Sequence, residues 1–423
     1  MDFTPSPRSL ALRAQIERFM ADLVLPSMAE WHRWSDAGVF PLDLVLDLQA
    51  RAREQGLWNL CLPKLADDEP GTRLSTTDYA PLAEAMGRVP WAAELFNCNA
   101  PDSGNMELLQ MFASPMQRER WLMPLLRGEM RSCFAMSEPD VASSDPTQLE
   151  TRITRDGDHY VINGRKWFIT GAAHPNCRVA LVMGHSASPS DEEGADHHHS
   201  HSIVLVPMDS PGLAIERNIP VMDHQALDGH CELVFRNVRV PVDHLLGEEG
   251  AGFAMAQARL GPGRVHHAMR SIGQCELALE LMCERALERR TFGQRVGDFA
   301  NVQDWIAESR LEIDQARLLV LHAAWKMDTL GNAAARVDAS AIKLVTSRLQ
   351  TRVLDRAMQV FGAMGLTPDT PLARLWAWGR ALRLLDGPDE VHLRTVARAE
   401  LSGAKKRRGA NAAHLRRWMP APT

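Results

Sequence analysis

The chain has 423 residues, of which 45% are apolar and 24% charged, which is the composition of a folded globular protein and excludes a disordered one. The net charge of −6 argues against a general attraction to nucleic acid, and no apolar run approaches the roughly 18 residues that a membrane span needs. The seven cysteines are scattered without a Cys-x-x-Cys pair, and the first residues lack the basic-then-apolar order of a signal peptide, so we expect reduced thiols and a cytoplasmic location.

Residues 1–130 are expected to form an N-terminal helical domain. Apolar residues recur there at helical spacing, and Pro and Gly separate the periodic segments from one another. The periodic positions begin with Leu12, Ile16, Phe19 and Leu23, and they continue over 45–52, 79–86 and 115–126.

Residues 131–246 are expected to form a middle β-domain. Asp156-Gly157 and Asn163-Gly164 are turn pairs typical of β-hairpins, and short apolar runs flank them. Because no long helix lies between these runs, the segment predicts an antiparallel β-barrel or sandwich. The predicted strands are 149–154, 159–162, 166–170, 179–183, 202–206, 213–219 and 231–240.

Residues 247–404 are expected to form a four-helix bundle, and a basic tail follows over 405–423. Apolar residues form long stripes at helical spacing in this part, and the connections between the stripes are short. The four predicted helices run through 272–286, 305–327, 336–361 and 388–402.

Two polar stretches resemble binding sites but have simpler interpretations. The tract from His197 to His201 lies in an acidic, Ser- and Gly-rich stretch between two predicted strands, so a solvated insertion loop is favoured over a metal site. The basic stretches 405–408 and 416–417 predict a solvated helix end or mobile tail rather than a nucleic-acid or lipid patch. We therefore expect no metal and no nucleic-acid partner. The motifs of Rossmann dehydrogenases, P-loop NTPases, α/β-hydrolases and zinc proteases are also absent.

Three segments carry a more specific signal, and the first one follows the N-terminal domain. It holds Phe134, Met136 and Ser137, and then Ser143 and Ser144. Small and hydroxylated residues let backbone amides and hydroxyls approach a planar or phosphorylated ligand closely. A loop that simply joins two domains has a similar composition.

The second and third segments each place functional groups where a ligand can reach them. Phe168 and Thr170 share one face of a predicted strand, so they are either a ring and a hydroxyl lying along an aromatic cofactor or an ordinary pair of sheet residues. Asp386 stands before Gly387-Pro388, a bend that opens a helix. Its carboxylate therefore either meets a substrate beside the positive helix N-terminus or caps that helix.

Taken in this order, the three segments resemble those of the acyl-CoA dehydrogenase family. The stretches 289–293 (Arg-Arg-Thr-Phe-Gly) and 359–365 (Gln-Val-Phe-Gly-Ala-Met-Gly) add two further family motifs, and the resemblance covers roughly residues 10–402. It implies an α+β, mostly α, fold: a helical domain, a β-domain and a four-helix bundle, with FAD held between the last two. Because subunits of this family share their FAD sites, it also implies a homodimer or a dimer of dimers.

The resemblance implies FAD contacts in several parts of the chain. The first loop meets the flavin ring and the pyrophosphate, the strand pair packs on the other side of the ring, and residues at the ends of bundle helices reach the FAD of a neighbouring subunit. The implied FAD contacts are Phe134, Met136, Ser137, Ser143, Ser144, Phe168, Thr170, Arg289, Phe292, Gln303, Gln359, Gly362, Ala363, Pro388 and Glu390. One departure is that Ala300 stands where the family has a Gln, for which Gln303 is only a loose substitute.

The resemblance also implies the reaction. A carboxylate removes the α-proton of an acyl-CoA thioester while hydride leaves the β-carbon for N5 of the flavin, and the developing enolate needs hydrogen-bond donors at the thioester oxygen. Asp386 takes the place of the base, and its backbone N–H is one of the donors. The implied substrate contacts are Ser144, Gly261, Arg264 and Gly387. For Arg264 the alternative is a role at the surface or at a helix end. The expected electron acceptor is an electron-transfer flavoprotein, in fatty acid β-oxidation.

Two substitutions distinguish this chain within the family. The base is Asp, in Asp-Gly-Pro, where Glu in Glu-Gly-Thr is usual, and Gly261-Pro262-Gly263-Arg264 lacks the acidic residue that usually precedes the Arg. An Asp holds its oxygens roughly 1 Å farther back, and an error of that size can cost about 100-fold in rate, so the backbone or the substrate must adjust.

These features look most like the branch that in animals is fused to an aminoglycoside-phosphotransferase-like kinase domain and is associated with hydroxyacyl-CoA breakdown. The alternatives of the same fold are O2-using flavin oxidases, namely acyl-CoA oxidase and nitroalkane oxidase. A non-catalytic, DNA-associated homologue is less favoured, because of the net charge of −6 and the retained carboxylate.

Overall fold

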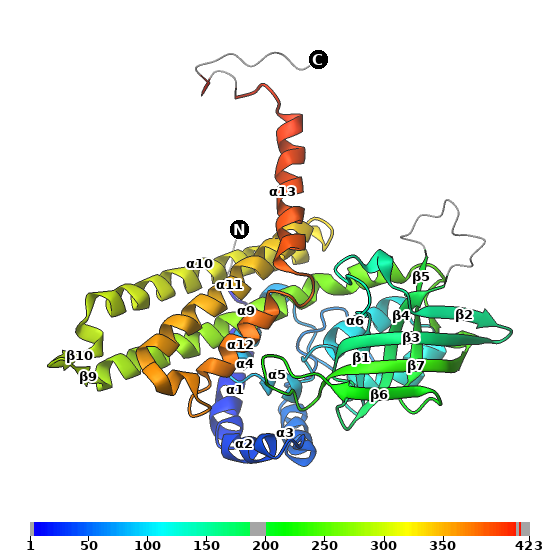
Figure 1. The fold of residues 1–423 in the computed structure, drawn as a ribbon, viewed down its shortest axis with the longest axis horizontal. Coiled ribbons are helices and arrows are strands. Elements are labelled where there is room, and N and C mark those ends of the chain that lie inside the picture. The colour runs from blue at the N-terminus through cyan, green and yellow to red at the C-terminus, as the bar shows by residue number, and fades with distance from the viewer. Residues whose placement is uncertain (1–3, 187–199, 412–413, 416–423) are drawn as a thin grey trace.

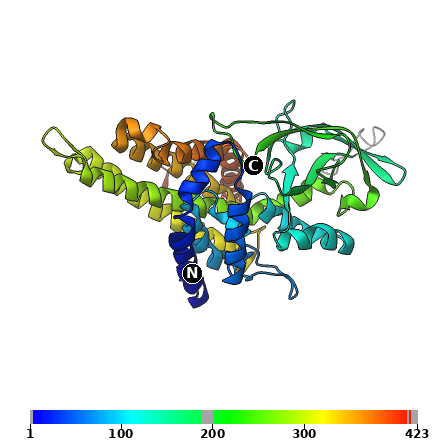
Figure 2. The same cartoon turned by 90° about the horizontal axis from the view of Figure 1, so that it is seen from below.

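The computed structural model describes residues 4–186, 200–411 and 414–415, so residues 197–199 of the predicted histidine tract and the basic pair 416–417 lie outside the described residues. The expectation of a solvated loop is wrong for the last residue of the tract, because His201 is fully buried at the start of a strand. A helical part, a β-domain and a second helical part follow one another along the chain (Figure 1). In Figure 2 the β-domain lies at one end of the molecule, and most helices of the other two parts pack together beside it. The predicted α+β, mostly α, three-part fold is confirmed.

The N-terminal part is helical, as predicted, and side-chain caps begin three of its helices. The hydroxyl of Ser6 accepts a hydrogen bond from the backbone N–H of Ser9, and Ser75 does the same for Asp78. Ile16, at the centre of the first predicted stripe, is fully buried. The elements are α1 (Pro7–Phe19), η1 (Met20–Val24), α2 (Met28–Asp36), α3 (Leu42–Glu54), α4 (Thr76–Gly87), α5 (Ala92–Leu95), α6 (Asp102–Phe112), α7 (Pro115–Gln117), η2 (Arg118–Leu122) and α8 (Met123–Leu126).

An eight-stranded sheet forms the β-domain. Its order is β6-β7-β3-β2-β4-β5-β8, and β1 pairs with β4 off this path. The strands are β1 (Arg131–Ala135), β2 (Arg152–Asp156), β3 (His159–Thr170), β4 (Cys177–His185), β5 (His201–Pro207), β6 (Leu213–Asn218), β7 (His230–Pro241) and β8 (Leu245–Leu246), with single helical turns η3 (Pro146–Gln148) and η6 (Val242–His244). The long ladders are antiparallel, as predicted, whereas β1 runs parallel to β4.

The hairpin turn expected at Asn163-Gly164 is wrong, because β3 runs through both residues. The ladder between β3 and β7 shifts register between Ile162 and Gly164, which marks a bulge. A Cβ on Gly164 would lie 2.4 Å from Oγ1 of Thr151. Asn163 accepts a hydrogen bond from the backbone N–H of Asn237 across the ladder (2.8 Å). The Asn-Gly pair thus permits a close approach of two chain segments instead of a reversal.

Strand β1 is missing from the predicted strands because its sequence, Arg-Ser-Cys-Phe-Ala, shows no apolar alternation. Arg131 is nevertheless buried, since its guanidinium forms ion pairs with Glu94 and Asp102. Ser132 donates a hydrogen bond to the same Asp102 (2.6 Å). A buried polar network therefore takes the place of apolar burial, and Phe134, expected in a loop, lies in this strand.

The C-terminal part is built on long helices joined by short connections. The elements are α9 (Gly252–Glu288), β9 (Arg290–Thr291), β10 (Gln294–Arg295), η7 (Val296–Asp298), α10 (Ala300–Leu330), α11 (Arg336–Phe361), η8 (Gly362–Leu366), α12 (Leu372–Leu382) and α13 (Asp389–Lys406). The predicted helices over 272–286, 305–327 and 336–361 are confirmed as parts of α9, α10 and α11.

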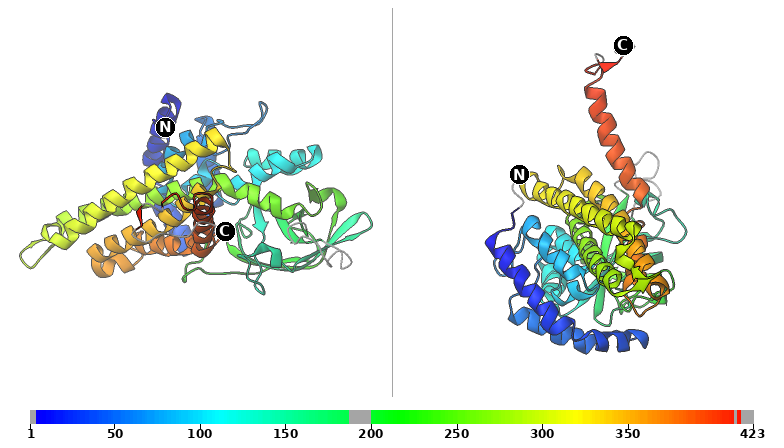
Figure 3. Two further views of the ribbon diagram at one scale, coloured as in Figure 1. Left: turned by 90° about the horizontal axis from the view of Figure 1, so that it is seen from above. Right: turned by 90° about the vertical axis from the view of Figure 1, so that its left-hand side faces the viewer.

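Helix α12 takes the bundle position that the sequence analysis assigns to the helix over 388–402. It packs on α11, where Gly379 lies so close to Gln350 that a Cβ would be 2.9 Å from that side chain. The predicted last helix exists as α13, but it leaves the body of the molecule (Figures 1 and 3). Only Asp389 and His392 of α13 are buried.

Two apolar clusters form the core. The larger joins the N-terminal helices to the bundle, and the smaller lies within the β-domain. Each of the seven cysteines is free, as expected. In the described segments we find no helix of the length and apolarity needed to cross a bilayer. Those segments also hold no cluster of three or more potential metal ligands.

Candidate active site

Asp386 lies in the turn between α12 and α13, on an unusual backbone. Its φ is +50°, and Gly387 follows at φ +94°, so two consecutive residues occupy the left-handed region. A non-glycine residue there costs of order 1–3 kcal/mol and persists only where its surroundings hold it. The side chain of Asp386 is 39% exposed, so a ligand can reach it. The N-cap alternative is wrong, since Pro388 occupies the N-cap position of α13 and no side chain caps it.

Helix α9 presents basic groups to this carboxylate. His267 Nε2 lies 3.7 Å from Asp386 Oδ2. Arg270 approaches His267 Nδ1 with one guanidinium nitrogen at 3.5 Å, and because arginine only donates, Nδ1 accepts and the neutral ring carries its proton on Nε2. Burial lowers the pKa of Arg264, while the nearby charge of Asp386 acts in the opposite direction. The buried Nε of Arg264 has no hydrogen-bond partner among the described groups.

The turn after Asp386 is tied to α11 and α12 through Asp389. This buried carboxylate receives hydrogen bonds from Arg383 (2.9 Å) and Arg348 (3.1 Å), and Lys343 Nζ lies 3.8 Å away. Burial alone would raise the pKa of Asp389, but the bonds from Arg383 and Arg348 bring it below its ordinary value. Asp389 is therefore a structural anchor and not a second free base.

The loop after β1 and strand β3 are joined by a buried ion pair. Lys166, fully buried, donates from Nζ to Glu138 (2.7 Å) and to the carbonyl of Met136 (2.8 Å). The backbone N–H of Trp167 donates to the carbonyl of Ser137 (3.0 Å). The first two predicted segments thus lie side by side.

Phe168 and Thr170 follow this pair on β3. Phe168 has φ +53° and is 41% exposed, which is uncommon for a large aromatic side chain. The hydroxyl of Thr170 lies 3.0 Å from His230 Nδ1, and the ring of His230 is nearly parallel to that of Trp378 on α12, with centroids 6.4 Å apart. These contacts connect the predicted flavin-facing strand to the helix that leads to Asp386.

The two predicted serines of the first loop differ. Ser143 accepts a hydrogen bond from the backbone N–H of Glu138 (2.9 Å) and donates back to its carbonyl, so its hydroxyl stabilises the loop. Ser144 is exposed. Pro388 and Glu390 lie next to Asp386 at the start of α13, and Gly261 lies within α9.

The remaining predicted FAD contacts lie far from these groups within one chain. They sit at the end of the bundle remote from the β-domain, around the β9–β10 hairpin and the end of α11 (Figure 1). Phe292, at the tip of the hairpin, is 94% exposed. The Gln303 amide donates to the carbonyl of Gly297 (3.0 Å). The residues in this remote group are Arg289, Phe292, Gln303, Gln359, Gly362 and Ala363.

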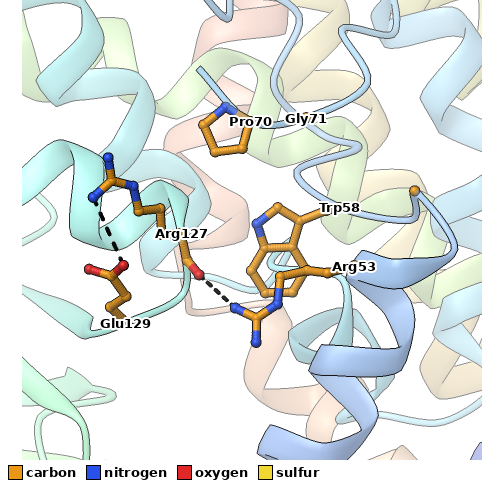
Figure 4. A pocket seen from close by; sticks show the side chains of 7 residues that line it. Arg53, Trp58, Pro70, Gly71, Arg127 and Glu129 are labelled. Atoms are coloured by element: carbon orange, nitrogen blue, oxygen red, sulfur yellow. Dashed lines mark hydrogen bonds and ion pairs between the residues drawn. The ribbon is translucent and has the colours of Figure 1, made fainter. Parts of the chain in front are cut away.

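Two surface hollows contain none of the predicted site residues. One, of about 460 Å³, lies on the N-terminal part between Arg53, Trp58 and Arg127, where Arg53 covers the indole and donates to the carbonyl of Arg127 (Figure 4). The other, of about 580 Å³, lies between Trp121 and Met208. Neither contains a residue of the Asp386 turn.

Comparisons with known proteins agree with this arrangement. The descriptions of the N-terminal, middle and C-terminal domains of acyl-CoA dehydrogenase match residues 6–129, 133–238 and 250–401. The chain belongs to the acyl-CoA dehydrogenase family. It is 49% identical to the Mycobacterium tuberculosis protein named probable acyl-CoA dehydrogenase FadE2, over 96% of this chain and 98% of that one.

Two further acyl-CoA dehydrogenase relatives are similar over nearly the whole chain. Acyl-CoA dehydrogenase family member 11 of Gallus gallus is 45% identical over 96% of this chain, which spans about half (52%) of that animal relative. A solved Mycobacterium abscessus structure assigned to the acyl-CoA dehydrogenases has a TM-score of 0.89 and 46% identity, over 95% of this chain and 99% of that one. The resemblance to this family, and to longer animal members of it, is confirmed.

Acyl-CoA dehydrogenases are flavoproteins, and the residues of this chain fit a flavin. Phe168 offers a half-exposed aromatic ring, Thr170 a hydroxyl two residues further along β3, and the loop locked by Lys166 a row of backbone groups. A planar, hydrogen-bonding ring system needs these elements. Phe134 on β1, Met136 and Ser137 on the loop that follows it, and Phe168 and Thr170 on β3 would hold the ring.

Four residues around these sites have no role that is predicted from the sequence, namely His267, His392, Lys166 and Lys343. His267 and His392 stand within stretches that also hold Arg264 and Asp386, so proximity in sequence was an available signal. Lys166 and Lys343 are two of only six lysines, and Lys343 interrupts the apolar run from Ala341 to Val345. A lysine at a position expected to be buried signals a paired charge.

Proposed function

We propose that this protein uses FAD to remove two hydrogens from the α- and β-carbons of an acyl-CoA thioester, with Asp386 as the base. The observation that carries the proposal is the half-exposed carboxylate of Asp386 on its left-handed turn, at the end of the helix whose Trp378 lies against His230 of the β-domain. This position supports a base that faces a flavin held by the β-domain.

Asp386 accepts the proton from the α-carbon of the substrate. Arg264 and the Nε2–H of His267 place positive charge or a donor beside the carboxylate and so favour its ionised form before the substrate arrives. FAD, when bound, accepts the hydride that leaves the β-carbon. Negative charge that develops on the thioester oxygen needs an N–H donor, for which we propose the backbone of Asp386.

The substrate contacts proposed from the family are Ser144, Gly261, Arg264 and Gly387. Of these, Gly387 bears most directly on the chemistry, since a Cβ there would lie 3.2 Å from His392 Nε2. Glycine keeps the turn compact beside the position at which a thioester must sit.

We further propose that the acyl group carries a hydroxyl and that the reaction serves hydroxyacyl-CoA breakdown, as part of fatty acid β-oxidation. The support is the Asp-Gly-Pro and Gly-Pro-Gly-Arg pattern, shared with the branch that is longer in animals. This chain matches only about half of such a relative, so any kinase step would need other sequence.

We propose that the active form is a homodimer or a dimer of dimers. A neighbouring subunit would meet the hairpin that carries Arg289 and Phe292, and Phe292 is 94% exposed in one chain. Helix α13 projects from the body and exposes Leu393 and Leu401. Apolar groups exposed in this way mark surfaces for association.

An electron-transfer flavoprotein is the proposed acceptor and the cytoplasm the proposed compartment. The free state of all seven cysteines supports a reducing environment. Membership of the acyl-CoA dehydrogenase family supports the electron-transfer flavoprotein as the acceptor.

The proposal is tested by mixing the purified, FAD-loaded protein anaerobically with a panel of straight-chain, branched and 4-hydroxylated acyl-CoAs and with nitroalkanes, and by repeating the assay in the presence of O2. We expect the visible absorbance of the oxidised flavin to bleach with at least one of the acyl-CoAs, because the flavin accepts the hydride. Catalytic O2 consumption without an added acceptor would instead assign the protein to the acyl-CoA oxidases, and bleaching by nitroalkanes alone to the nitroalkane oxidases.

A further inference from the structure

Two side chains from different helices hold the two carbonyls of the Asp386 turn. His392 on α13 has Nε2 3.1 Å from the carbonyl oxygen of Asp386, and because a carbonyl only accepts, Nε2 carries the proton. Lys343 on α11 donates from Nζ to the carbonyl of Gly387 at 2.6 Å. Both left-handed peptides are thus fixed from outside the turn.

Both donors are buried, at 2% exposure for His392 and 8% for Lys343. Burial lowers the pKa of His392 to about 4 and that of Lys343 to about 8, so the imidazole is neutral at neutral pH. Placing an ammonium group in such a site is unfavourable unless it is paired. Asp389, 3.8 Å from Lys343, supplies the pairing. A neutral donor would satisfy one carbonyl as well, so the fold alone does not require a lysine at this position.

The position of the base depends on these two bonds more than it would for a longer side chain. The carboxylate of an aspartate stands one bond from Cβ, so a rotation of its own peptide moves the oxygens almost directly. A displacement of about 1 Å costs about 100-fold in rate. The imidazole of His392 also packs against Gly387, where a Cβ would meet Nε2 at 3.2 Å.

We propose that Lys343 and His392 are positioning residues that clamp the Asp386-Gly387 turn and so set the reach of the short base. The inference rests on the proposed function, because it concerns the same proton transfer. By fixing the backbone of the turn, the two hydrogen bonds compensate for the methylene that Asp386 lacks relative to glutamate. Neither Lys343 nor His392 touches the reacting atoms.

The test compares variants that lose a donor with variants that keep one. His392→Phe and Lys343→Met remove the two bonds at similar volume, His392→Gln keeps an N–H donor, and Lys326→Met on α10, which breaks an ion pair with Asp338 (2.7 Å), is the control. Each protein is assayed for FAD content, melting temperature, affinity for a redox-inactive 3-thiaacyl-CoA, and the rate of flavin bleaching by the acyl-CoA most active with the wild type.

We expect His392→Phe and Lys343→Met to bleach about 10- to 100-fold more slowly, with FAD content and 3-thiaacyl-CoA affinity within about twofold of the wild type. His392→Gln should recover to within about fivefold of wild type, and Lys326→Met should be unchanged. A merely structural role would lower FAD content and melting temperature in step with the rate, and His392→Gln would give no rescue.

Bleaching rates of both donor-loss variants within twofold of the wild type would overturn the clamp and leave the proposed function standing. If Lys343→Met does not fold, the pair His392→Phe and His392→Gln decides by the same criterion. A wild-type protein that no acyl-CoA reduces would overturn the proposed function and the clamp together.

Discussion

Replacing Lys166 by Met should both destabilise the protein and loosen the loop that follows β1, for which we propose a contact with the flavin. Lys166 is fully buried and Glu138 is 3% exposed, and their 2.7 Å ion pair ties β3 to the loop that follows β1. The Lys166→Met variant keeps the unbranched shape of the side chain, one atom shorter, but leaves the carboxylate of Glu138 buried without its counter-charge.

The magnitude follows from the remaining partners of Glu138. Removing one member of a buried pair costs about 3–5 kcal/mol. Glu138 keeps hydrogen bonds from the backbone N–H groups of Glu150 (2.7 Å) and Thr151 (2.9 Å), so we expect the lower end, about 3 kcal/mol. The double variant Lys166→Met/Glu138→Gln buries no charge, and it should lose about 1–2 kcal/mol, because one backbone N–H then lacks an acceptor.

The free energy of unfolding by urea, measured for the FAD-free protein, gives the stability change, and a titration with FAD gives the affinity. We expect Lys166→Met to be less stable than the double variant and to bind FAD more weakly, since the carbonyl of Met136 loses its donor. A loss below 1 kcal/mol in Lys166→Met, or a double variant as unstable as Lys166→Met, would refute the reasoning.

Three further predictions follow from other parts of the structure. The pKa of buried His392 is about 4 and that of buried His266 about 3, so between about pH 6.5 and 4 the unfolded chain binds more protons than the folded one. The free energy of unfolding should therefore fall as pH falls through this window, by up to about 3 kcal/mol for His392 alone. The fall should be less steep in His392→Gln. A free energy of unfolding that does not change over this window would contradict the burial of these rings. Phe292→Ala should leave the melting temperature unchanged, because the ring is 94% exposed, but it should weaken subunit association as measured by light scattering. A dimer of unchanged stability and FAD affinity would show that the hairpin is not part of the proposed interface. Asp386→Glu, which restores the usual base of the family, should bleach more slowly than the wild type, because the turn is held for the shorter side chain; a faster variant would show that the backbone has made no adjustment.

The parts of the fold that could be predicted are those in which buried apolar residues recur at the regular spacing of a helix or a strand. The stripes from Leu12 to Leu23 and from Trp305 to Met327 became helices because their apolar faces pack into one core. Strand β1 could not be predicted because the burial of Arg131 depends on Glu94 and Asp102, which are distant in sequence.

The candidate site also contains residues that could be predicted from the sequence and residues that could not. Asp386, Phe168 and Thr170 could be singled out from local sequence and family resemblance. Lys343 could not, because its role depends on a contact with the carbonyl of Gly387, 44 residues away. Side chains that hydrogen-bond to backbone carbonyls leave little trace in a sequence, since many residue types can donate to a carbonyl oxygen.

For α13 the sequence predicts the helix correctly but not its position in the fold. Its amphipathic start predicted a helix of the bundle, but only Asp389 and His392 are buried, and Gly379 lets α12 pack closely on α11 instead. Helix periodicity therefore predicted the helix, whereas the close glycine contact decided which helix joins the bundle.

The rate of flavin bleaching in Asp386→Asn tests the central claim most directly. The amide keeps the size of the side chain and cannot accept the α-proton, so we expect normal FAD content, a melting temperature within a few degrees of the wild type, and bleaching by acyl-CoA slowed by at least about 1,000-fold. Bleaching within about tenfold of the wild type, in a protein with full FAD content, would show that Asp386 is not the base.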